Sequence, residues 1–130
     1  MITIVKAEGL ARCPIGGSPD PYVNIEVTES KGEELNVHKH QTTVRRAKLN
    51  PVFKEAFSIP LASTTTAEDV TVLLLVRDKD YILQDSNIGH VRLGVGMTTN
   101  EHVESWEKVF KKPGQSVTIK CKLCTMPIDD

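Results

Sequence analysis

The chain has 130 residues, of which 39% are hydrophobic and 25% are charged, and its formal net charge is −1. This length and composition are typical of one soluble globular domain with a buried core, and they exclude a largely disordered chain. The nearly neutral charge gives no overall attraction to nucleic acid or anionic lipid, so such binding would require a local patch. The longest apolar run, over residues 70–76, is far shorter than the roughly 20 residues of a membrane-spanning helix.

The three cysteines, Cys13, Cys121 and Cys124, are too few for the disulfide framework of a secreted protein. The Cys-x-x-Cys spacing of the last two invites a redox or zinc interpretation, but no second cysteine or histidine pair stands at ligand spacing. We therefore expect reduced, structural cysteines and a cytosolic location. The chain opens without the charged and apolar leader of a signal peptide, so any membrane anchor is expected elsewhere in a longer protein.

The hydrophobic pattern along the chain is mostly that of β-strands. Apolar residues alternate with polar ones, or form short runs of strand length, and clusters of turn-forming residues separate the segments. The expected strands cover residues 2–5, 22–27, 42–46, 53–59, 70–76, 88–93 and 117–123. The continuous apolar run over residues 70–76 indicates a strand that is buried on both faces.

One segment has the pattern of an amphipathic helix. Asn100 can cap a helix that runs to about Lys111, in which Val103, Trp106 and Phe110 share one face. We expect this face to pack against the rest of the domain and not to bind a ligand. Seven or eight short strands with one late helix predict an all-β fold, an antiparallel β-sandwich in a single domain over residues 1–130.

Two predicted loops carry the acidic residues of interest, and sandwich folds place binding sites in the loops at one end. The first loop ends at Asp20, and the second, residues 77–87, contains Asp78, Asp80 and Asp85. In extended backbone Asp78 and Asp80 point the same way, and calcium binds six to eight oxygens, several of them from carboxylates. Judged on this spacing alone, solvated aspartates in a turn are the more common alternative.

Three segments resemble motifs of C2 domains. Residues 18–23 (SPDPYV) are similar to the SDPYV motif, residues 49–57 (LNPVFKEAF) to the LNPxxNExF segment, and residues 76–80 with Ile88-Gly89 to the VxDxD…IG loop. The Gly94 region, the helix and the last strand further resemble the second C2 domain of synaptotagmins and of their rabphilin and double-C2 relatives. The resemblance covers nearly the whole chain. It implies an eight-stranded antiparallel β-sandwich of the C2 type, with one short helix before the last strand.

In that family, five aspartates from two loops bind two or three calcium ions, which bridge to anionic lipid headgroups. The resemblance implies three of these ligands here: Asp20, Asp78 and Asp80. Pro14 and Ser86 stand at the other two positions. Asp85 lies one place early, so it would take part only if the loop were shifted. Because fewer carboxylates hold a divalent cation less tightly, we expect weakened or absent calcium binding, and we expect no other cofactor.

The positions that family members insert into lipid correspond to Ile15 and Ile82, with Leu83 beside the latter. Exposed apolar residues at loop tips indicate shallow membrane insertion. A second family site is a lysine-rich strand that binds phosphoinositides and partner proteins. The resemblance assigns it here to His38, Lys39, His40, Arg45, Arg46 and Lys48. The histidines would add charge at mildly acid pH, while an ordinary solvated strand face is the alternative.

Taken together, these features predict a synaptotagmin-like module of vesicle trafficking or exocytosis that docks on anionic phospholipid with weakened or absent calcium dependence. The alternative is a protein-interaction C2 domain that binds a trafficking partner, such as a SNARE, with little lipid affinity. No nucleophile-elbow motif or phosphate-binding glycine loop is present in the sequence, so an enzyme is not expected. We expect a monomeric domain, cytoplasmic and peripheral to membranes, that does not bind nucleic acid.

Overall fold

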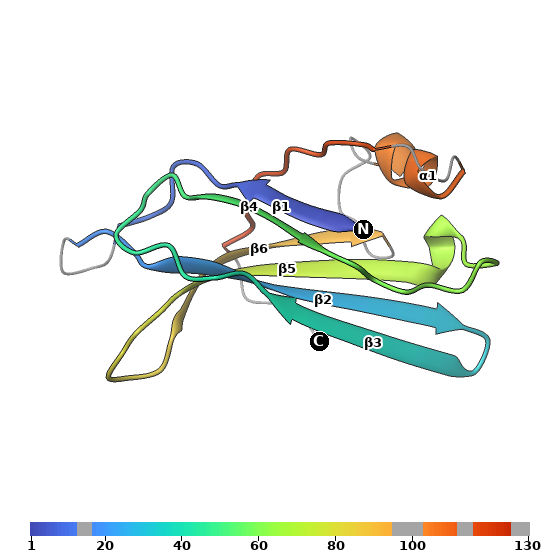
Figure 1. Cartoon of the computed structure of the whole chain (residues 1–130), viewed down its shortest axis with the longest axis horizontal. Coiled ribbons are helices and arrows are strands. Elements are labelled where there is room, and N and C mark those ends of the chain that lie inside the picture. The colour runs from blue at the N-terminus through green and yellow to red at the C-terminus, as the bar shows by residue number, and fades with distance from the viewer. Residues whose placement is uncertain (13–16, 95–102, 112–115, 126–130) are drawn as a thin grey trace.

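The computed structural model describes residues 1–12, 17–94, 103–111 and 116–125. Strands dominate this part of the chain, with one turn of 3₁₀-helix and one α-helix (Figure 1). The elements follow the order β1 (Ile2–Lys6), β2 (Pro21–Lys31), β3 (Glu34–Gln41), β4 (Val52–Phe57), η1 (Ala67–Asp69), β5 (Val70–Asp78), β6 (Ser86–Gly94) and α1 (Val103–Lys111).

The strands form two antiparallel sheets. The larger sheet has the order β3-β2-β5-β6, and the smaller one pairs β1 with β4 (Figure 1). Strand β2 is paired on both sides, and its pairing with β5 runs in one register from Pro21↔Asp78 to Glu29↔Val70. The point where the chain enters β2 therefore lies beside the point where it leaves β5, and the two acidic loops meet at one end of the sandwich.

The core lies between the two sheets. Alternate side chains of β2 and β5 face it, and Phe53 of β4 meets them from the smaller sheet. The buried apolar residues of these strands are Val23, Ile25, Val27, Phe53, Val70, Val72 and Val76. Burying one such side chain stabilises the fold by roughly 1.5–3 kcal/mol, so this set fixes how the sheets pack and leaves the end loops free for binding.

Helix α1 packs on the sandwich through the aromatic face that the sequence predicts. Trp106 and Phe110 lie against the core, with their ring centroids 5.2 Å apart. The indole Nε1 of Trp106 also donates a hydrogen bond to the carbonyl oxygen of Ala67, at 3.1 Å. The packing role is therefore confirmed for these two residues. The predicted cap at Asn100 and the stop at Pro113-Gly114 lie outside the described residues.

The strand predicted over residues 42–46 is wrong. Strand β3 ends at Gln41, and the following segment crosses the end of β2 instead of extending the sheet. The hydroxyl of Thr42 accepts a hydrogen bond from the N–H of Val23 at 2.9 Å, and the N–H of Arg45 donates to the carbonyl of Pro21 at 2.9 Å. Alternating residues suit a strand only where a neighbouring strand is available to pair with them.

The strand predicted over residues 117–123 is likewise not formed. Its odd-numbered residues are less exposed than its even-numbered ones, so the expected two-sided pattern is present. Backbone pairing occurs only just beyond it, where His90 and Cys124 exchange hydrogen bonds of 2.9 and 2.8 Å. The described residues thus contain six strands of the eight expected in the sandwich.

Candidate functional site

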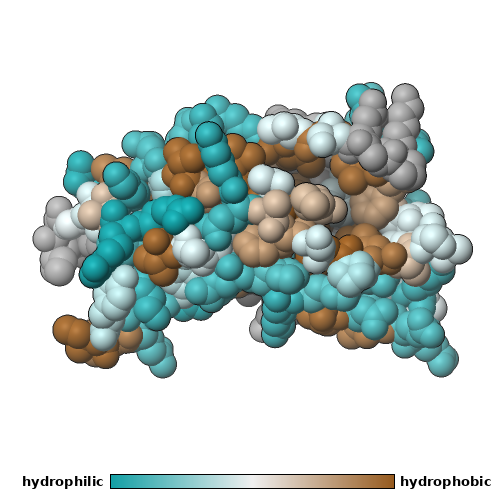
Figure 2. Space-filling model, in the orientation of Figure 1, coloured by the Kyte–Doolittle hydropathy of each residue, from teal (hydrophilic) through white to brown (hydrophobic). Residues whose placement is uncertain are grey.

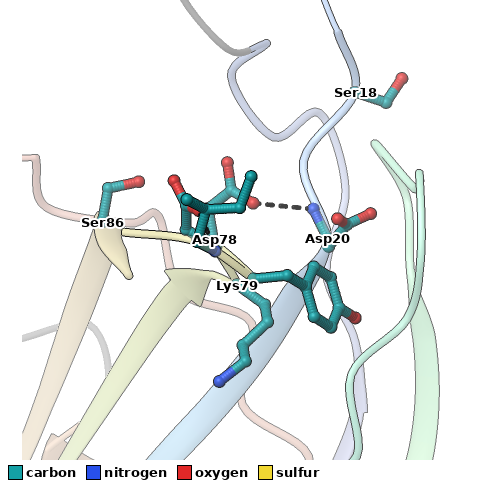
Figure 3. Close-up of a pocket in the computed structure, with 8 residues that line it drawn as sticks. Ser18, Asp20, Asp78, Lys79 and Ser86 are labelled. Carbon is teal, nitrogen blue, oxygen red and sulfur yellow. Dashed lines mark hydrogen bonds between the residues drawn. The ribbon is translucent and has the colours of Figure 1, made fainter. Parts of the chain in front are cut away.

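The two acidic loops are joined at the end of the sandwich where β2 begins and β5 ends. The N–H of Asp20 donates to Oδ1 of Asp78 at 2.9 Å, as Figure 3 shows, and the N–H of Lys79 donates to the carbonyl of Asp20 at 3.0 Å. An open pocket lies between the loops. The residues that line it are Ser18, Asp20, Asp78, Lys79, Asp80, Tyr81, Ile82 and Ser86. Four positions named by the resemblance, the three aspartates and Ser86, therefore come together.

The carboxylates of Asp20 and Asp80 accept hydrogen bonds from nearby backbone. Oδ1 of Asp20 accepts the N–H of Ala47 at 2.7 Å. Oδ1 of Asp80 accepts the N–H of Leu83 at 2.8 Å and that of Ile82 at 2.9 Å. These two donors, with Leu83 the stronger, hold the pKa of Asp80 below its ordinary value. Asp80 therefore shapes the turn that carries the loop tip.

Asp85 does not line the pocket but ties the loop to β2. Its Oδ2 accepts a hydrogen bond from the hydroxyl of Tyr22, a buried residue, and its Oδ1 accepts the N–H of Asp80 at 2.9 Å. Lys79 Nζ lies 3.8 Å from the same Oδ2. The tyrosine bond, followed by the Asp80 bond, holds the pKa of Asp85 below its ordinary value. Burial, followed by the bond to Asp85, raises the pKa of Tyr22 to about 12.

These side chains do not fit a calcium site as they lie. Calcium requires six to eight oxygens that converge on one point. Here all four candidate carboxylates accept hydrogen bonds from the chain itself, and Asp85 is turned toward β2. Within the described ranges, no three histidine, cysteine or acidic side chains are grouped so that they could hold a metal ion. Pro14 lies outside those ranges.

The tip of the β5–β6 loop is apolar and exposed. Ile82 is 92% exposed, Leu83 76% and Tyr81 59%. The loop projects from the body of the domain in Figure 1, and Figure 2 shows a hydrophobic patch at its end. Ile15, the other residue expected to insert into lipid, lies outside the described residues. A contiguous exposed apolar patch is a candidate interaction surface, whereas apolar side chains exposed singly are common on protein surfaces.

The residues predicted to form one basic strand are divided between two places. Only His38, Lys39 and His40 belong to β3, while Arg45, Arg46 and Lys48 lie in the β3–β4 connection. Backbone hydrogen bonds from Lys48 to Pro19 and from Arg45 to Pro21 hold this connection at the loop end of the sandwich. There the guanidinium carbon of Arg46 lies 4.9 Å from the centroid of the Tyr81 ring.

The three basic residues of β3 also point to different sides. Lys39 pairs with Glu26, whereas His38 and His40 pair with Val27 and Ile25, which face the core. The His40 ring lies 5.3 Å from that of Phe57 in the smaller sheet. Because successive strand residues alternate between faces, the histidines do not extend the positive surface of Lys39. The six residues expected on one basic strand are therefore divided, three on β3 and three in the β3–β4 connection.

Two tyrosines at this end make contacts that the sequence does not predict. Tyr22 belongs to the SPDPYV segment and Tyr81 precedes the apolar tip, but their partners Asp85 and Arg46 are distant in sequence. Neither spacing nor charge pattern indicates such contacts, because only the meeting of the loops creates them.

Comparison with known proteins gives one consistent family. The model of the C2 domain family matches residues 1–109. Synaptotagmin-7 of Mus musculus is 30% identical over 117 residues, which cover 90% of this chain and 28% of that protein. The chain thus spans little more than a quarter of this relative.

Solved structures share the fold. A C2 domain of plant Extended Synaptotagmin 1 superposes with a TM-score of 0.58 at 24% identity, covering 71% of this chain and 64% of that one. Human GIVD cytosolic phospholipase A2 matches with a TM-score of 0.60 at 20% identity over 72% of this chain, but over only 12% of the enzyme. In the described residues no helix is long and apolar enough to cross a bilayer. By its sequence motifs, its sandwich and the matching family model, this chain belongs to the C2 domain family.

Proposed function

We propose that this C2 domain docks peripherally on anionic phospholipid membranes through its β5–β6 loop, with little or no dependence on calcium, in a protein of vesicle trafficking or exocytosis. The exposure of Ile82 and Leu83 beside the acidic pocket carries this proposal. The similarity to synaptotagmins over 90% of the chain supports the trafficking context. On this basis the domain is a targeting module and not a catalyst, with its membrane surface on the cytoplasmic side.

The apolar tip is suited to reversible attachment. Burying Ile82 and Leu83 in the acyl region contributes roughly 1.5–3 kcal/mol for each side chain. Their sum is close to the ~4 kcal/mol of a millimolar dissociation constant, which describes weak and reversible docking. Additional attraction to anionic headgroups, about 1 kcal/mol for each nearby basic residue, would strengthen it.

The hydrogen bonds within the loop support independence from calcium. Asp80 bonds the N–H groups of Ile82 and Leu83, while Asp85 bonds both Tyr22 and the N–H of Asp80. The acidic side chains thus organise the loop through donors of the same chain. A loop held in this way needs no cation to present its apolar tip.

Vesicle co-sedimentation tests the proposal. The whole chain is mixed with phosphatidylcholine vesicles containing phosphatidylserine, either with calcium or with chelator, and compared with Ile82→Ser/Leu83→Ser. The matched control is Leu35→Ser/Val37→Ser, which removes two exposed apolar side chains from β3, 63% and 46% exposed. We expect the wild-type chain to bind equally with calcium and with chelator. Ile82→Ser/Leu83→Ser is expected to lose this binding, and Leu35→Ser/Val37→Ser to keep it.

Two results would contradict the proposed calcium-independent docking on lipid. Binding that requires calcium would show that the acidic pocket rearranges around the ion, and the claim of calcium independence would fail. If the wild-type chain bound in neither condition, docking on lipid would be overturned in favour of a protein-binding C2 domain.

A further inference from the structure

Strand β3 forms an open and regular edge of the larger sheet (Figure 1). It has eight residues and pairs with β2 over its whole length without a shift of register. The other edge strand, β6, is shifted in its pairing with β5, and its His90 exchanges backbone hydrogen bonds with Cys124. In the described residues no strand pairs with the side of β3 that faces away from β2. The N–H and C=O groups on that side can therefore pair with another strand.

Two apolar side chains of this edge are exposed. Leu35 is 63% exposed and Val37 46%, and both lie on the face of the sheet that is turned away from the core. Their neighbours across the ladder in β2 are Ser30 and Thr28, short polar side chains that leave them exposed. Sheet edges are usually protected by proline, by bulges or by charged side chains. Strand β3 contains no proline and no bulge, and its one charge on this face is Lys39.

The sequence of β3 and of the turn before it is complementary to itself. When two copies of β3 run antiparallel with Asn36 opposite Asn36, Leu35 of each copy lies opposite Val37 of the other. The same register brings Glu33, in the turn, to Lys39 of the other copy. Each of these pairs occurs twice, because a twofold axis relates the copies. Apolar pairs and opposite charges at facing positions stabilise neighbouring strands.

Other registers lose this complementarity. Sliding the copies by two residues places Leu35 opposite Lys39 in one direction, and Lys31 opposite Lys39 in the other. Sliding by one residue sends the apolar side chains of the two copies to opposite faces of the sheet. On the second face of the favoured register, Glu34 lies opposite His38, so no like charges meet there. One register thus satisfies both the apolar and the charged positions.

We infer that two copies of this chain pair through their β3 edges, antiparallel and with Asn36 at the twofold axis, so that their larger sheets become continuous. This surface goes beyond the proposed docking and does not rest on it. Pairing of two strand edges buries little area compared with the roughly 1,200–2,000 Å² of stable interfaces. The dimer is therefore weak, with a dissociation constant on the order of 100 µM, and the chain is the expected monomer in dilute solution.

The geometry of the pair leaves the lipid-docking loops separate. Strand β3 runs toward the end of the sandwich that carries the acidic loops, as β5 does (Figure 1). Because the two β3 strands are antiparallel, the loop ends of the two copies point in opposite directions. Pairing therefore adds no second loop to the same bilayer, and docking of each copy is unchanged by it.

Sedimentation equilibrium tests the inference on the whole chain between about 10 µM and 1 mM. We expect the wild-type mass to rise from monomer toward dimer over this range. Leu35→Ser/Val37→Ser is expected to remain monomeric, and Ile82→Ser/Leu83→Ser to pair as wild type does. Circular dichroism would establish that both variants are folded. The same two variants have the opposite outcomes in vesicle binding, so pairing and docking are separated.

Charge reversal tests the register. Glu33→Lys and Lys39→Glu each create two like-charge pairs in the dimer, so each is expected to weaken pairing about tenfold. The double variant, and an equimolar mixture of the two single variants, restore opposite charges and are expected to pair as wild type does. Lys39→Glu also places a negative charge opposite Glu26 of its own sheet. The mixture controls for this effect, because it leaves that contact unchanged.

Three results would each overturn the inference. They are a monomeric mass for the wild-type chain throughout the range, a dimer that Leu35→Ser/Val37→Ser does not weaken, and a mixture of the charge-reversal variants that stays monomeric. None of them bears on docking, which vesicle binding measures. A wild-type chain that pairs but binds no vesicles would support this inference and overturn the docking proposal.

Discussion

The hydroxyl of Tyr22, on β2, donates a hydrogen bond to the carboxylate of Asp85, on the β5–β6 loop. Tyr22 is only 5% exposed, so this bond joins the sandwich to the base of the loop that carries the apolar tip. Asp85 also accepts a hydrogen bond from the N–H of Asp80. The carboxylate of Asp80 in turn accepts hydrogen bonds from the N–H groups of Ile82 and Leu83, so these three residues are linked to β2 through Asp85. The hydroxyl of one buried tyrosine thus constrains the loop that carries the proposed docking surface.

Tyr22→Phe removes this bond and keeps the ring. We expect the free energy of unfolding to fall by about 1 kcal/mol, the usual net value of a hydrogen bond within a protein. Urea unfolding followed by circular dichroism would measure it. Tyr81→Phe is the matched control, because its hydroxyl has no recorded partner in the described residues and its ring stays over Arg46. Equal losses in the two variants would show that the bond to Asp85 contributes nothing specific.

The same hydroxyl predicts a dependence on alkaline pH. The pKa of Tyr22 is raised from 10.0 to about 12 in the folded state. A group with a raised folded pKa contributes stability that is fully present below its unfolded pKa and is lost as the pH rises through the folded one. The unfolding free energy should therefore fall between pH 10 and about pH 12.

Tyr22→Phe separates this effect from the ionisation of other groups. We expect the wild-type chain to lose more stability than the variant over that pH range, when both are unfolded with urea in matched buffers. Parallel curves for the two proteins would refute a role of Tyr22 in the alkaline transition.

The sequence predicts much of the fold because burial and turns leave local patterns. The strand around Val23 to Val27 packs as expected, since its alternate apolar side chains face the core. The prediction that residues 70–76 are buried on both faces is wrong, because Val70, Val72 and Val76 are buried while the side chains between them are only half-buried. The pattern predicts less where a strand depends on its neighbour. Strand β3 pairs residue by residue with β2 although its own side chains are mostly polar, and residues 117–123 alternate without forming a ladder.

The sequence predicts which residues belong to the candidate site, but it does not predict which of them contact one another. The acidic positions and the exposure of Ile82 follow from loop position and residue type. The orientation of Asp85 toward Tyr22, and of Arg46 toward Tyr81, depends on how separate loops meet at the end of the sandwich. Alternation along β3 also separates Lys39 from its two histidines, which charge counting along the sequence treats as one patch.

Gly94, at the end of β6, is expected to tolerate no side chain. Its φ is +94°, and a Cβ atom there would lie 2.1 Å from the carbonyl oxygen of Val70. We expect Gly94→Ala to lower the unfolding free energy by more than about 2 kcal/mol, because both the backbone strain and the clash must be relieved. The measurement is again urea unfolding.

Gly32→Ala provides the control for backbone strain alone. Its φ is +62°, and nothing lies within 4 Å of an added Cβ. The cost of a left-handed alanine is about 1–2 kcal/mol. A loss in Gly94→Ala that is no larger than in Gly32→Ala would show that the contact with Val70 relaxes at no cost.

Stability measurements on Arg45 and Arg46 distinguish an arginine that is hydrogen-bonded within the fold from one that only contacts a ring at the surface. Arg45→Gln removes donors to two backbone carbonyls and the ion pair with Glu55, so we expect it to cost about 1–2 kcal/mol of unfolding free energy. Arg46→Gln removes only a ring contact at the surface and should change it by less than about 0.5 kcal/mol. Thermal and urea unfolding of both variants would test this difference. If Arg46→Gln were as destabilising as Arg45→Gln, the contact between the Arg46 guanidinium and the Tyr81 ring would contribute to the fold as much as the hydrogen bonds of Arg45 do.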